Sequence, residues 1–404
     1  MLVQARNFYA LLWHATFLAL TTAFTDINLI LPSMIVRAGG TEIQVGLLTA
    51  IMVGTPIVGQ LVFASYLHIK PRKKGYLLLG INLRVVALAL VAAVLWKSDI
   101  LASSVIIGFV MLSMFIFAIA GTFAAVSYID ILGKSLLQEQ RPQFFVNRQV
   151  LSSVAFLASA LIARHILGRL GYPANYVWLF TTASGVLLVG SLGFWVIDEI
   201  KVEGAGNNYK VSQVLKSIPS HLRLDRNLRR YIYLVNLTGF GLTLMPFYVV
   251  MAKTEYGLTG HQVGTYLLTN ILGMITSNYM WAKIVRRFGF SGVVKGCIVC
   301  GSILPVLALL LVRAPIGYFL IVFFLMGVGL SARKIAFEGL FIEITSDENL
   351  ALHKGIVGAV SLSTALFPLV AGGLITIAGY APVFLLGSTV VASAYRFATP
   401  LRSQ

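Results

Sequence analysis

The sequence predicts an all-α integral membrane protein with twelve transmembrane helices arranged in two six-helix halves. Apolar residues make up 58% of the 404 residues and charged residues only 11%, whereas soluble domains carry about 25% charged residues. Apolar runs of about 20 residues recur along the whole chain, each long enough to cross the hydrocarbon core as a helix. Short motifs of the first half return in the second, which indicates a duplicated architecture.

The predicted transmembrane helices follow from these runs in chain order. In the first half they lie at residues 9–36, 44–68, 75–96, 101–127, 144–167 and 175–197. In the second half they lie at residues 231–252, 261–282, 290–312, 315–338, 356–378 and 381–397. The first run is too long for a signal-peptide core and no small-residue cleavage site follows it, so we expect it to be retained.

Two motifs relate the halves. Thr41-Glu-Ile-Gln-Val-Gly46 returns as Thr259-Gly-His-Gln-Val-Gly264. Tyr128-Ile-Asp130 returns as Phe341-Ile-Glu343, at an offset of 213 residues. In duplicated membrane proteins a binding site commonly lies between the two halves, which rock about it.

The predicted domains are a first half over 1–198, a cytoplasmic basic linker over 199–230 and a second half over 231–404. Within the linker, Lys210–Leu222 carries apolar residues at helical spacing opposite basic ones. This pattern predicts an amphipathic helix on the inner membrane surface.

The net charge of +17 is explained by membrane topology rather than by nucleic-acid binding. With the amino terminus inside, Lys and Arg concentrate at inner helix ends and inner loops, as the positive-inside rule requires. The basic residues left outside are Arg37, Lys97, Arg164, Arg169, Lys253 and Arg313. We therefore expect a multi-pass protein of the cell membrane with both termini cytoplasmic, anionic lipid headgroups at its inner face and no nucleic-acid partner.

Asp26 is the clearest candidate for function, because ionisable groups deep in apolar runs are costly. In a continuous helix it would lie about 15 Å from Val36, near the midplane. A carboxylate there is desolvated and is a candidate to load and unload a proton near neutral pH. Thr22, one turn earlier on the same helix face, is a candidate to hydrogen-bond it. The alternative is a carboxylate neutralised by Thr22 or by a neighbouring helix, with a structural role alone. Asn28 belongs to the same polar stretch and is a candidate ligand contact.

The tenth predicted helix carries a denser cluster of charge, formed by Arg333, Lys334, Glu338 and Glu343. Lys334 and Glu338 are four residues apart and share a helix face. The cluster either lines the inner half of a cavity and binds an anion, or reaches the cytoplasmic interface and pairs internally. Arg84, in the third run, is expected to extend toward the inner headgroups.

Two inner loops share a charge pattern. Asp130 is followed eleven residues later by Arg141, and Glu343 is followed at the same spacing by Lys354. The pattern predicts paired salt bridges that hold one state closed as a gate. The alternative is simple anchoring at the headgroups.

Uncharged polar residues give weaker signals. Asn236 and Asn270, in the seventh and eighth runs, either contact a ligand or make helix-packing hydrogen bonds. Cys297 and Cys300 lack an accompanying His or carboxylate, so we expect packing and no metal. The chain contains no phosphate-loop, His-Glu-x-x-His or Gly-x-Ser-x-Gly motif, so we expect no cofactor and no enzyme.

These features resemble the major facilitator superfamily over essentially the whole chain. Between the second and third runs, Ala64–Lys74 keeps the basic end of the family pattern Gly-x-x-x-Asp-Arg-x-Gly-Arg-Arg/Lys and lacks its Asp-Arg core. In the second half, Trp281–Gly289 keeps Arg and Gly and again lacks the Asp. Asp130 and Arg141-Pro142 are similar to the family's inner motif between the fourth and fifth helices.

The resemblance implies a monomeric secondary transporter that works by alternating access, often driven by a proton gradient. It places a central cavity between helices one, four, seven and ten. On this chain that cavity would include Asp26, Thr122, Tyr128, Asn236, Arg333 and Lys334. The expected substrate is a small polar, amphiphilic or anionic solute, and export is one candidate direction.

Two other classes stay open. A lipid or lipid-linked-sugar flippase on the same fold would have a cavity open to the bilayer and lined by Phe and Leu. A non-transporting receptor or scaffold would show no substrate-dependent flux and no need for Asp26.

Overall fold

The protein is entirely helical in the part of the chain that the computed structural model describes, residues 2–68, 70, 72–199, 211–345 and 350–398. The first half contains α1 (Leu2–Phe24), α2 (Ile30–Arg37), α3 (Glu42–His68), α4 (Lys74–Trp96), α5 (Ser103–Ser135), the short η1 (Gln138–Gln140), α6 (Arg141–Arg169) and α7 (Ala174–Val196). The second contains α8 (Val211–Leu224), α9 (Arg226–Tyr256), α10 (Gly260–Leu311), α11 (Leu320–Ile344), α12 (Leu350–Val360), α13 (Leu362–Ala378), α14 (Tyr380–Ser393) and the short η2 (Ala394–Phe397). The all-α prediction is confirmed.

Every predicted apolar run lies mostly on helix, and the first is interrupted between α1 and α2. Among the described residues, nine helices are long and apolar enough to cross a membrane. The eighth and ninth runs merge into α10, which bends at Gly289, where φ is 66° and favours glycine. The last run forms α14, which has only 14 residues. The structure is therefore consistent with twelve spans.

The repeated Thr-x-x-Gln motif is a helix start. At α10 the hydroxyl of Thr259 accepts a hydrogen bond from the backbone N–H of Gln262, while Gln262 Oε1 accepts the backbone N–H of Thr259 at 2.7 Å. At α3 the backbone N–H of Thr41 donates to Gln44 Oε1 at 2.9 Å. Satisfying otherwise orphaned N–H groups in this way is the capping-box arrangement, which explains why the motif occurs in both halves.

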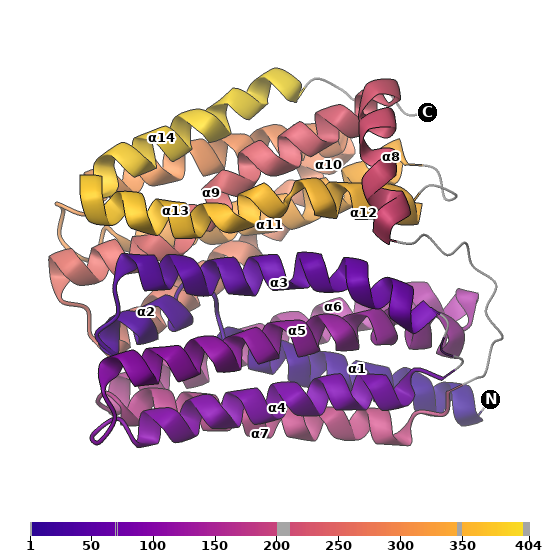
Figure 1. Ribbon diagram of the computed structural model, residues 1–404, viewed down its shortest axis with the longest axis horizontal. Coiled ribbons are helices and arrows are strands. Elements are labelled where there is room, and N and C mark those ends of the chain that lie inside the picture. The colour runs from indigo at the N-terminus through magenta and orange to yellow at the C-terminus, as the bar shows by residue number, and fades with distance from the viewer. Residues whose placement is uncertain (1, 69, 71, 200–210, 346–349, 399–404) are drawn as a thin grey trace. The chain divides into compact units, whose positions relative to one another are not determined.

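The chain divides into two compact units, one of residues 1–40 and 51–208 and the other of residues 41–50 and 209–404. In the first, α1 packs against α6 and α7, and α4 packs against α5 and α7 (Figure 1). In the second, α10 packs against α11 and α14, and α9 packs against α13 and α14. Each unit is a bundle whose backbone polar groups are satisfied within its helices, as a hydrocarbon environment requires.

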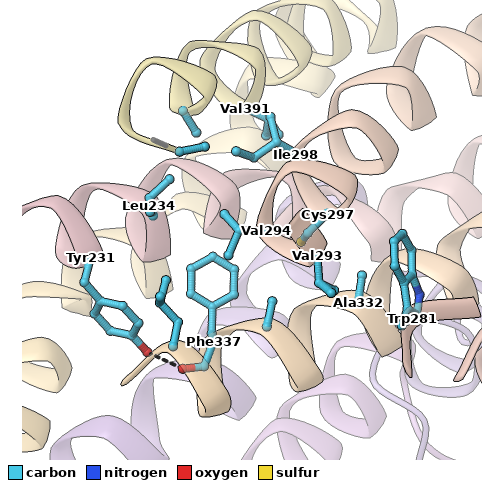
Figure 2. Close-up of a cluster of buried hydrophobic side chains, with 14 of the residues drawn as sticks. Tyr231, Leu234, Trp281, Val293, Val294, Cys297, Ile298, Ala332, Phe337 and Val391 are labelled. Carbon is cyan, nitrogen blue, oxygen red and sulfur yellow. Dashed lines mark hydrogen bonds between the residues drawn. The ribbon is translucent and has the colours of Figure 1, made fainter. Parts of the chain in front are cut away.

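The core of the second unit joins α9, α10, α11 and α14 (Figure 2). Its large polar aromatics find partners: the Tyr231 hydroxyl donates to the Phe337 carbonyl at 3.0 Å. Trp281 Nε1 donates to the Val328 carbonyl at 3.1 Å. Both rings are buried while their polar tips stay hydrogen-bonded.

The predicted amphipathic helix of the linker is present as α8. Its Ile218 and Leu222 pack against a small cluster of buried residues from α9 and α12, namely Leu228, Ile232, Leu352 and Ile356. Part of its apolar face therefore contacts other helices of the same unit. The beginning of the predicted linker, residues 200–210, lies outside the described residues.

Candidate functional site

Asp26 lies where the first apolar run breaks, between the end of α1 and the start of α2. Its Oδ1 atom accepts hydrogen bonds from the backbone N–H groups of Asn28 at 2.9 Å and Leu29 at 2.8 Å. Its own carbonyl accepts the N–H of Leu31 at 3.0 Å. The carboxylate therefore satisfies donors that the break in the helix leaves free.

Thr22 does not hydrogen-bond Asp26 in the described part of the chain, so this candidate contact is not formed. The Thr22 hydroxyl donates to the Leu18 carbonyl at 2.8 Å, one turn back in α1. Because the helix ends at Phe24, Asp26 no longer occupies the position one turn after Thr22.

The break is partly accessible. Leu29 and Ile30 are fully buried, whereas the side chains of Asp26 and Asn28 are half-buried. Irregular backbone at membrane depth is tolerated where it is enclosed by protein or lines a cavity. In transporters, such discontinuous helices carry substrate and ion sites.

The charged cluster of α11 is divided between the interior and the surface. Arg333 donates to the Thr238 hydroxyl and, at 3.1 Å, to the Val235 carbonyl, both on α9. Its guanidinium also lies 4.7 Å from the centroid of the Phe337 ring. Lys334 and Glu338 are exposed, and no ion pair between them occurs in the described part of the chain. Arg333 therefore points into its own half instead of acting with its two charged neighbours.

The uncharged candidates lie in different parts of the two units. The Asn236 amide donates to the Ile232 carbonyl and its Oδ1 accepts from the Thr364 hydroxyl at 2.6 Å. The Thr122 hydroxyl donates to the Ala118 carbonyl at 2.9 Å. Two buried polar atoms, Asn270 Oδ1 and the Tyr128 hydroxyl, have no hydrogen-bond partner among the described residues. Unpaired buried polar atoms are costly, so these two atoms are exceptions to the usual pairing of buried polar groups.

Asp130 forms ion pairs, although not with Arg141. Its two carboxylate oxygens lie 2.8 Å from Lys73 Nζ and 2.6 Å from Lys134 Nζ. Arg141 instead donates to the Gly133 carbonyl at 2.9 Å. We call this part of the first unit the basic end, defined by Lys73, Lys74, Lys134 and Arg141.

In the second half, Glu343 and Lys354 are both exposed. No ion pair joins them within the described ranges. The similar spacing in the two loops therefore does not produce similar pairs.

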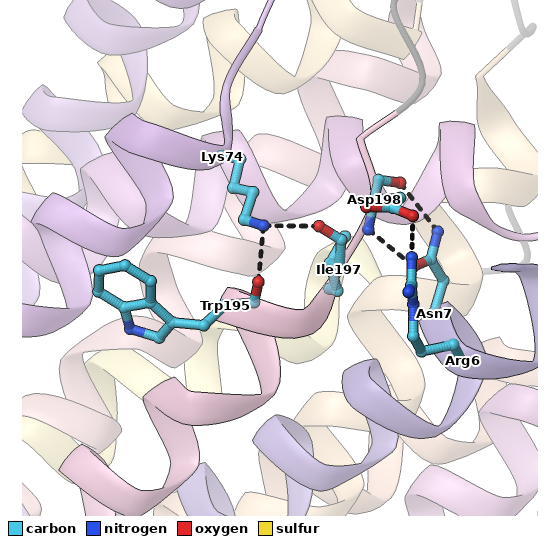
Figure 3. Close-up of polar contacts among 6 residues, drawn as sticks. All are labelled: Arg6, Asn7, Lys74, Trp195, Ile197 and Asp198. Atoms are coloured by element: carbon cyan, nitrogen blue, oxygen red, sulfur yellow. Dashed lines mark hydrogen bonds and ion pairs between the residues drawn. The ribbon is translucent and has the colours of Figure 1, made fainter.

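Two acidic residues that sequence reasoning left without a role follow α7, and they contact the starts of α4 and α1. The oxygens of Glu199 accept the backbone N–H groups of Lys73 at 2.6 Å and Lys74 at 2.8 Å, at the start of α4. Asp198 pairs with Arg6 and exchanges hydrogen bonds with Asn7 (Figure 3). In the sequence, these contacts could have been anticipated from the acidic pair that directly follows the sixth apolar run.

Lys74 completes the contact between α4 and the end of α7. Its Nζ donates to the carbonyls of Trp195 at 2.8 Å and Ile197 at 2.7 Å (Figure 3). Carbonyls at a helix carboxyl end are favourable partners for a cation.

The duplicated helical architecture and the long apolar helices are those of a multi-pass membrane protein, and a broken span is typical of transporters. The family model of the Major Facilitator Superfamily matches residues 12–289 and 231–399, so the chain belongs to this family. Family membership makes it a transporter rather than an enzyme. A search of curated proteins finds no relative that matches this chain.

Solved structures with a similar fold are themselves transporters. The nucleoside transporter NupG aligns with a TM-score of 0.76 at 10% identity, covering 97% of this chain and 98% of that one. A POT family transporter in complex with 5-aminolevulinic acid gives 0.73 at 11% identity, covering 96% and 94%. A bacterial homologue of the iron transporter ferroportin in an inward-facing state gives 0.72 at 12% identity, covering 98% and 99%. At these identities the likeness establishes the fold alone.

Proposed function

We propose that this protein is a proton-coupled secondary transporter that moves a small polar, amphiphilic or anionic solute by alternating access, with export as the first direction to test. The observation that carries the proposal is the broken first span, where the Asp26 carboxylate accepts two backbone N–H groups at membrane depth. A carboxylate that changes its protonation changes how strongly it holds those donors. Proton loading at Asp26 therefore alters the helix break itself.

The other candidate residues have proposed roles of two kinds. Substrate contacts are proposed for Asn28, Thr122, Tyr128, Asn236, Asn270, Arg333, Lys334 and Glu338. Gating is proposed for Asp130, Arg141, Glu343 and Lys354. The ion pair of Asp130 with Lys73 supports a gate at the basic end, because it joins the start of α4 to the end of α5. We place the protein in the cell membrane as a monomer, with both termini cytoplasmic.

The experiment uses Asp26→Asn beside the wild type. An Asn oxygen can accept the same two backbone N–H groups, so the variant keeps the helix break and removes the proton site. A library of small polar, amphiphilic and anionic solutes is screened by thermal shift on the purified full chain at pH 6 and pH 8, since a ligand that binds the folded state raises the melting temperature. The best hit is then followed as flux in proteoliposomes with an imposed pH gradient.

Gradient-driven flux that Asp26→Asn abolishes, with the same solute still bound, supports proton coupling at Asp26. Flux that changes neither with the pH gradient nor with Asp26→Asn contradicts proton coupling at Asp26, and the proposal that the protein is a transporter still stands. Stabilisation by lipids alone, with no solute flux, favours the flippase.

A further inference from the structure

Arg84 lies at the middle of α4 and does not extend toward the basic end. It is eleven residues after Lys73, so about 16 Å along the helix from the Lys73–Asp130 ion pair. Its guanidinium carbon lies 4.2 Å from the centroid of Phe117 on α5. Phe117 is thirteen residues from Asp130, about 20 Å, so the side chain extends away from that pair. The expectation that Arg84 reaches the headgroups near Lys74 is therefore wrong.

Among the described residues, the Arg84 guanidinium has no acidic partner. Its Nε is fully enclosed and has no hydrogen-bond partner, and no ion pair of Arg84 occurs among the described residues. A Cβ on Gly121 would lie 3.3 Å from this Nε, so the glycine lets the guanidinium approach α5 closely. A charged group at membrane depth without a partner is costly.

Arg84 lines a cavity of about 350 Å³ inside the first unit, between α3, α4 and α5. This volume falls within the range of small-molecule sites, about 300–1,000 Å³. Among the described residues that line it, Arg84 is the only charged one, and only Gln60 and Thr122 add polar side chains. The remaining lining is apolar, from residues such as Met52, Phe117 and Ile129.

The second half provides an internal comparison. At the repeat offset of 213 residues, Arg84 corresponds to Cys297 on α10, and Cys297 lines a small cavity together with Arg333. Each half therefore has one guanidinium that lines a cavity and lies over a phenylalanine ring, from α5 for Arg84 and from its own helix for Arg333. Arg333 has its hydrogen bonds satisfied by α9 and its cavity holds only about 20 Å³. By contrast, the Arg84 Nε has no hydrogen-bond acceptor among the described residues, and the cavity beside it is larger, at about 350 Å³.

We propose that the cavity of Arg84 binds a monoanionic amphiphile, with a carboxylate on the guanidinium and a short apolar body against α3 and α5. One guanidinium without a second cation suits a single negative charge, and its planar fork matches a carboxylate. Arg84 lies about 15 Å along α4 from Lys74, which favours a solute that enters the cavity over a lipid phosphate at the membrane surface. The site is separate from Asp26 and does not depend on proton coupling.

The test measures binding of octanoate and of its neutral analogue octanamide to the purified full chain in a neutral detergent, by isothermal titration. We expect octanoate to bind at least tenfold more tightly than octanamide. Arg84→Gln should remove that preference. Arg287→Gln is the matched control, because Arg287 also lies over a phenylalanine ring, at 5.2 Å, but is exposed on α10 and outside the cavity. It should leave the preference unchanged.

Ala125→Leu tests the cavity independently of the charge. Ala125 is an exposed lining residue, so a larger side chain fills the space without crowding the core. We expect it to weaken both probes by tenfold or more. Three outcomes would each overturn the proposal. The wild type binds octanoate and octanamide equally, Arg84→Gln keeps the preference for octanoate, or Ala125→Leu leaves octanoate binding unchanged.

A further experiment distinguishes a soluble carboxylate from a lipid phosphate as the occupant of the cavity. The protein is purified from bilayers of phosphatidylcholine with or without phosphatidylglycerol, and retained lipid is identified by native mass spectrometry. Retention of one phosphatidylglycerol that Arg84→Gln abolishes would identify a lipid phosphate as the occupant and overturn the soluble carboxylate. Solute flux is measured separately, so failure here leaves the transport proposal standing.

Discussion

Lys73 Nζ lies 2.8 Å from Asp130 Oδ1 and joins the start of α4 to the end of α5. The lysine side chain is 8% exposed and the aspartate 26%, so solvent screens this pair less than a surface pair. Lys134 reaches the second oxygen of the same carboxylate from one turn further along α5. Lys73 therefore connects two helices through Asp130, whereas Lys134 pairs with Asp130 within one helix.

The first prediction follows from this difference. Lys73→Gln should lower the free energy of unfolding by about 1–2 kcal/mol, because it removes a partly buried, charge-assisted contact between helices. Lys134→Gln should cost about 0.3–0.5 kcal/mol, as is usual for pairs within one helix. Chemical denaturation of both variants in detergent gives the comparison. Equal losses would mean that the inter-helix geometry adds nothing.

The second prediction concerns the cap at the broken span. Asp26→Ala should destabilise the protein by about 1–2 kcal/mol, because the N–H groups of Asn28 and Leu29 lose their acceptor. Asp26→Asn should stay within about 0.5 kcal/mol of the wild type, since Asn caps as well as Asp. Thermal and denaturant unfolding of the three proteins at one pH measures this. If Asn is as damaging as Ala, the charge itself holds the break.

The third prediction tests whether Thr238 is needed to accommodate Arg333. Thr238→Val should cost about 1–3 kcal/mol, because a buried charged donor loses an acceptor. Thr243→Val is the matched control: Thr243 is equally buried on α9, but its hydroxyl bonds only to Phe240 of its own helix. The control should be clearly milder in the same unfolding measurement. A result in the opposite order would show that Arg333 finds its partners elsewhere.

The fourth prediction concerns close packing between α10 and α11. A Cβ on Gly327 would lie 2.8 Å from the Met274 nitrogen and would also press on the Asn270 carbonyl. Gly327→Ala should therefore destabilise by about 1–3 kcal/mol through overpacking. Gly329→Ala should be neutral or slightly stabilising, because its Cβ would meet Cys300 at an ordinary 3.6 Å. Comparable melting temperatures for the two variants would contradict the close approach.

Much of the fold was predictable because hydrocarbon imposes strong and simple constraints. A spanning segment must be long, apolar and helical, so the runs along the chain map onto the observed helices. The repeated Thr-x-x-Gln motif could be seen as a repeat, and its capping geometry in α10 explains it. What the runs could not reveal was where a helix breaks: residues 9–36 read as one span, but α1 ends at Phe24 and α2 begins at Ile30.

The candidate site was less predictable. The sequence identified the charged residues within the apolar runs, but it did not identify the residues that they contact. Asp130 was matched with Arg141 by spacing along the chain, whereas the structure pairs it with Lys73 of α4. Arg84 was assigned to the headgroups because long basic side chains usually reach them, and the structure turns it onto Phe117 instead. Linear distance along a helix does not report which neighbouring helix lies alongside.

The sequence by itself determined the class of this protein, its helical spans, its duplicated halves and the residues that are costly in a membrane. Those properties depend on composition and on short-range periodicity, which the chain carries locally. Only the tertiary structure decided which buried charges are satisfied. Arg333 finds acceptors on α9, and Arg84 faces an open apolar cavity, because hydrogen bonds and cavities depend on the placement of helices far apart in the chain.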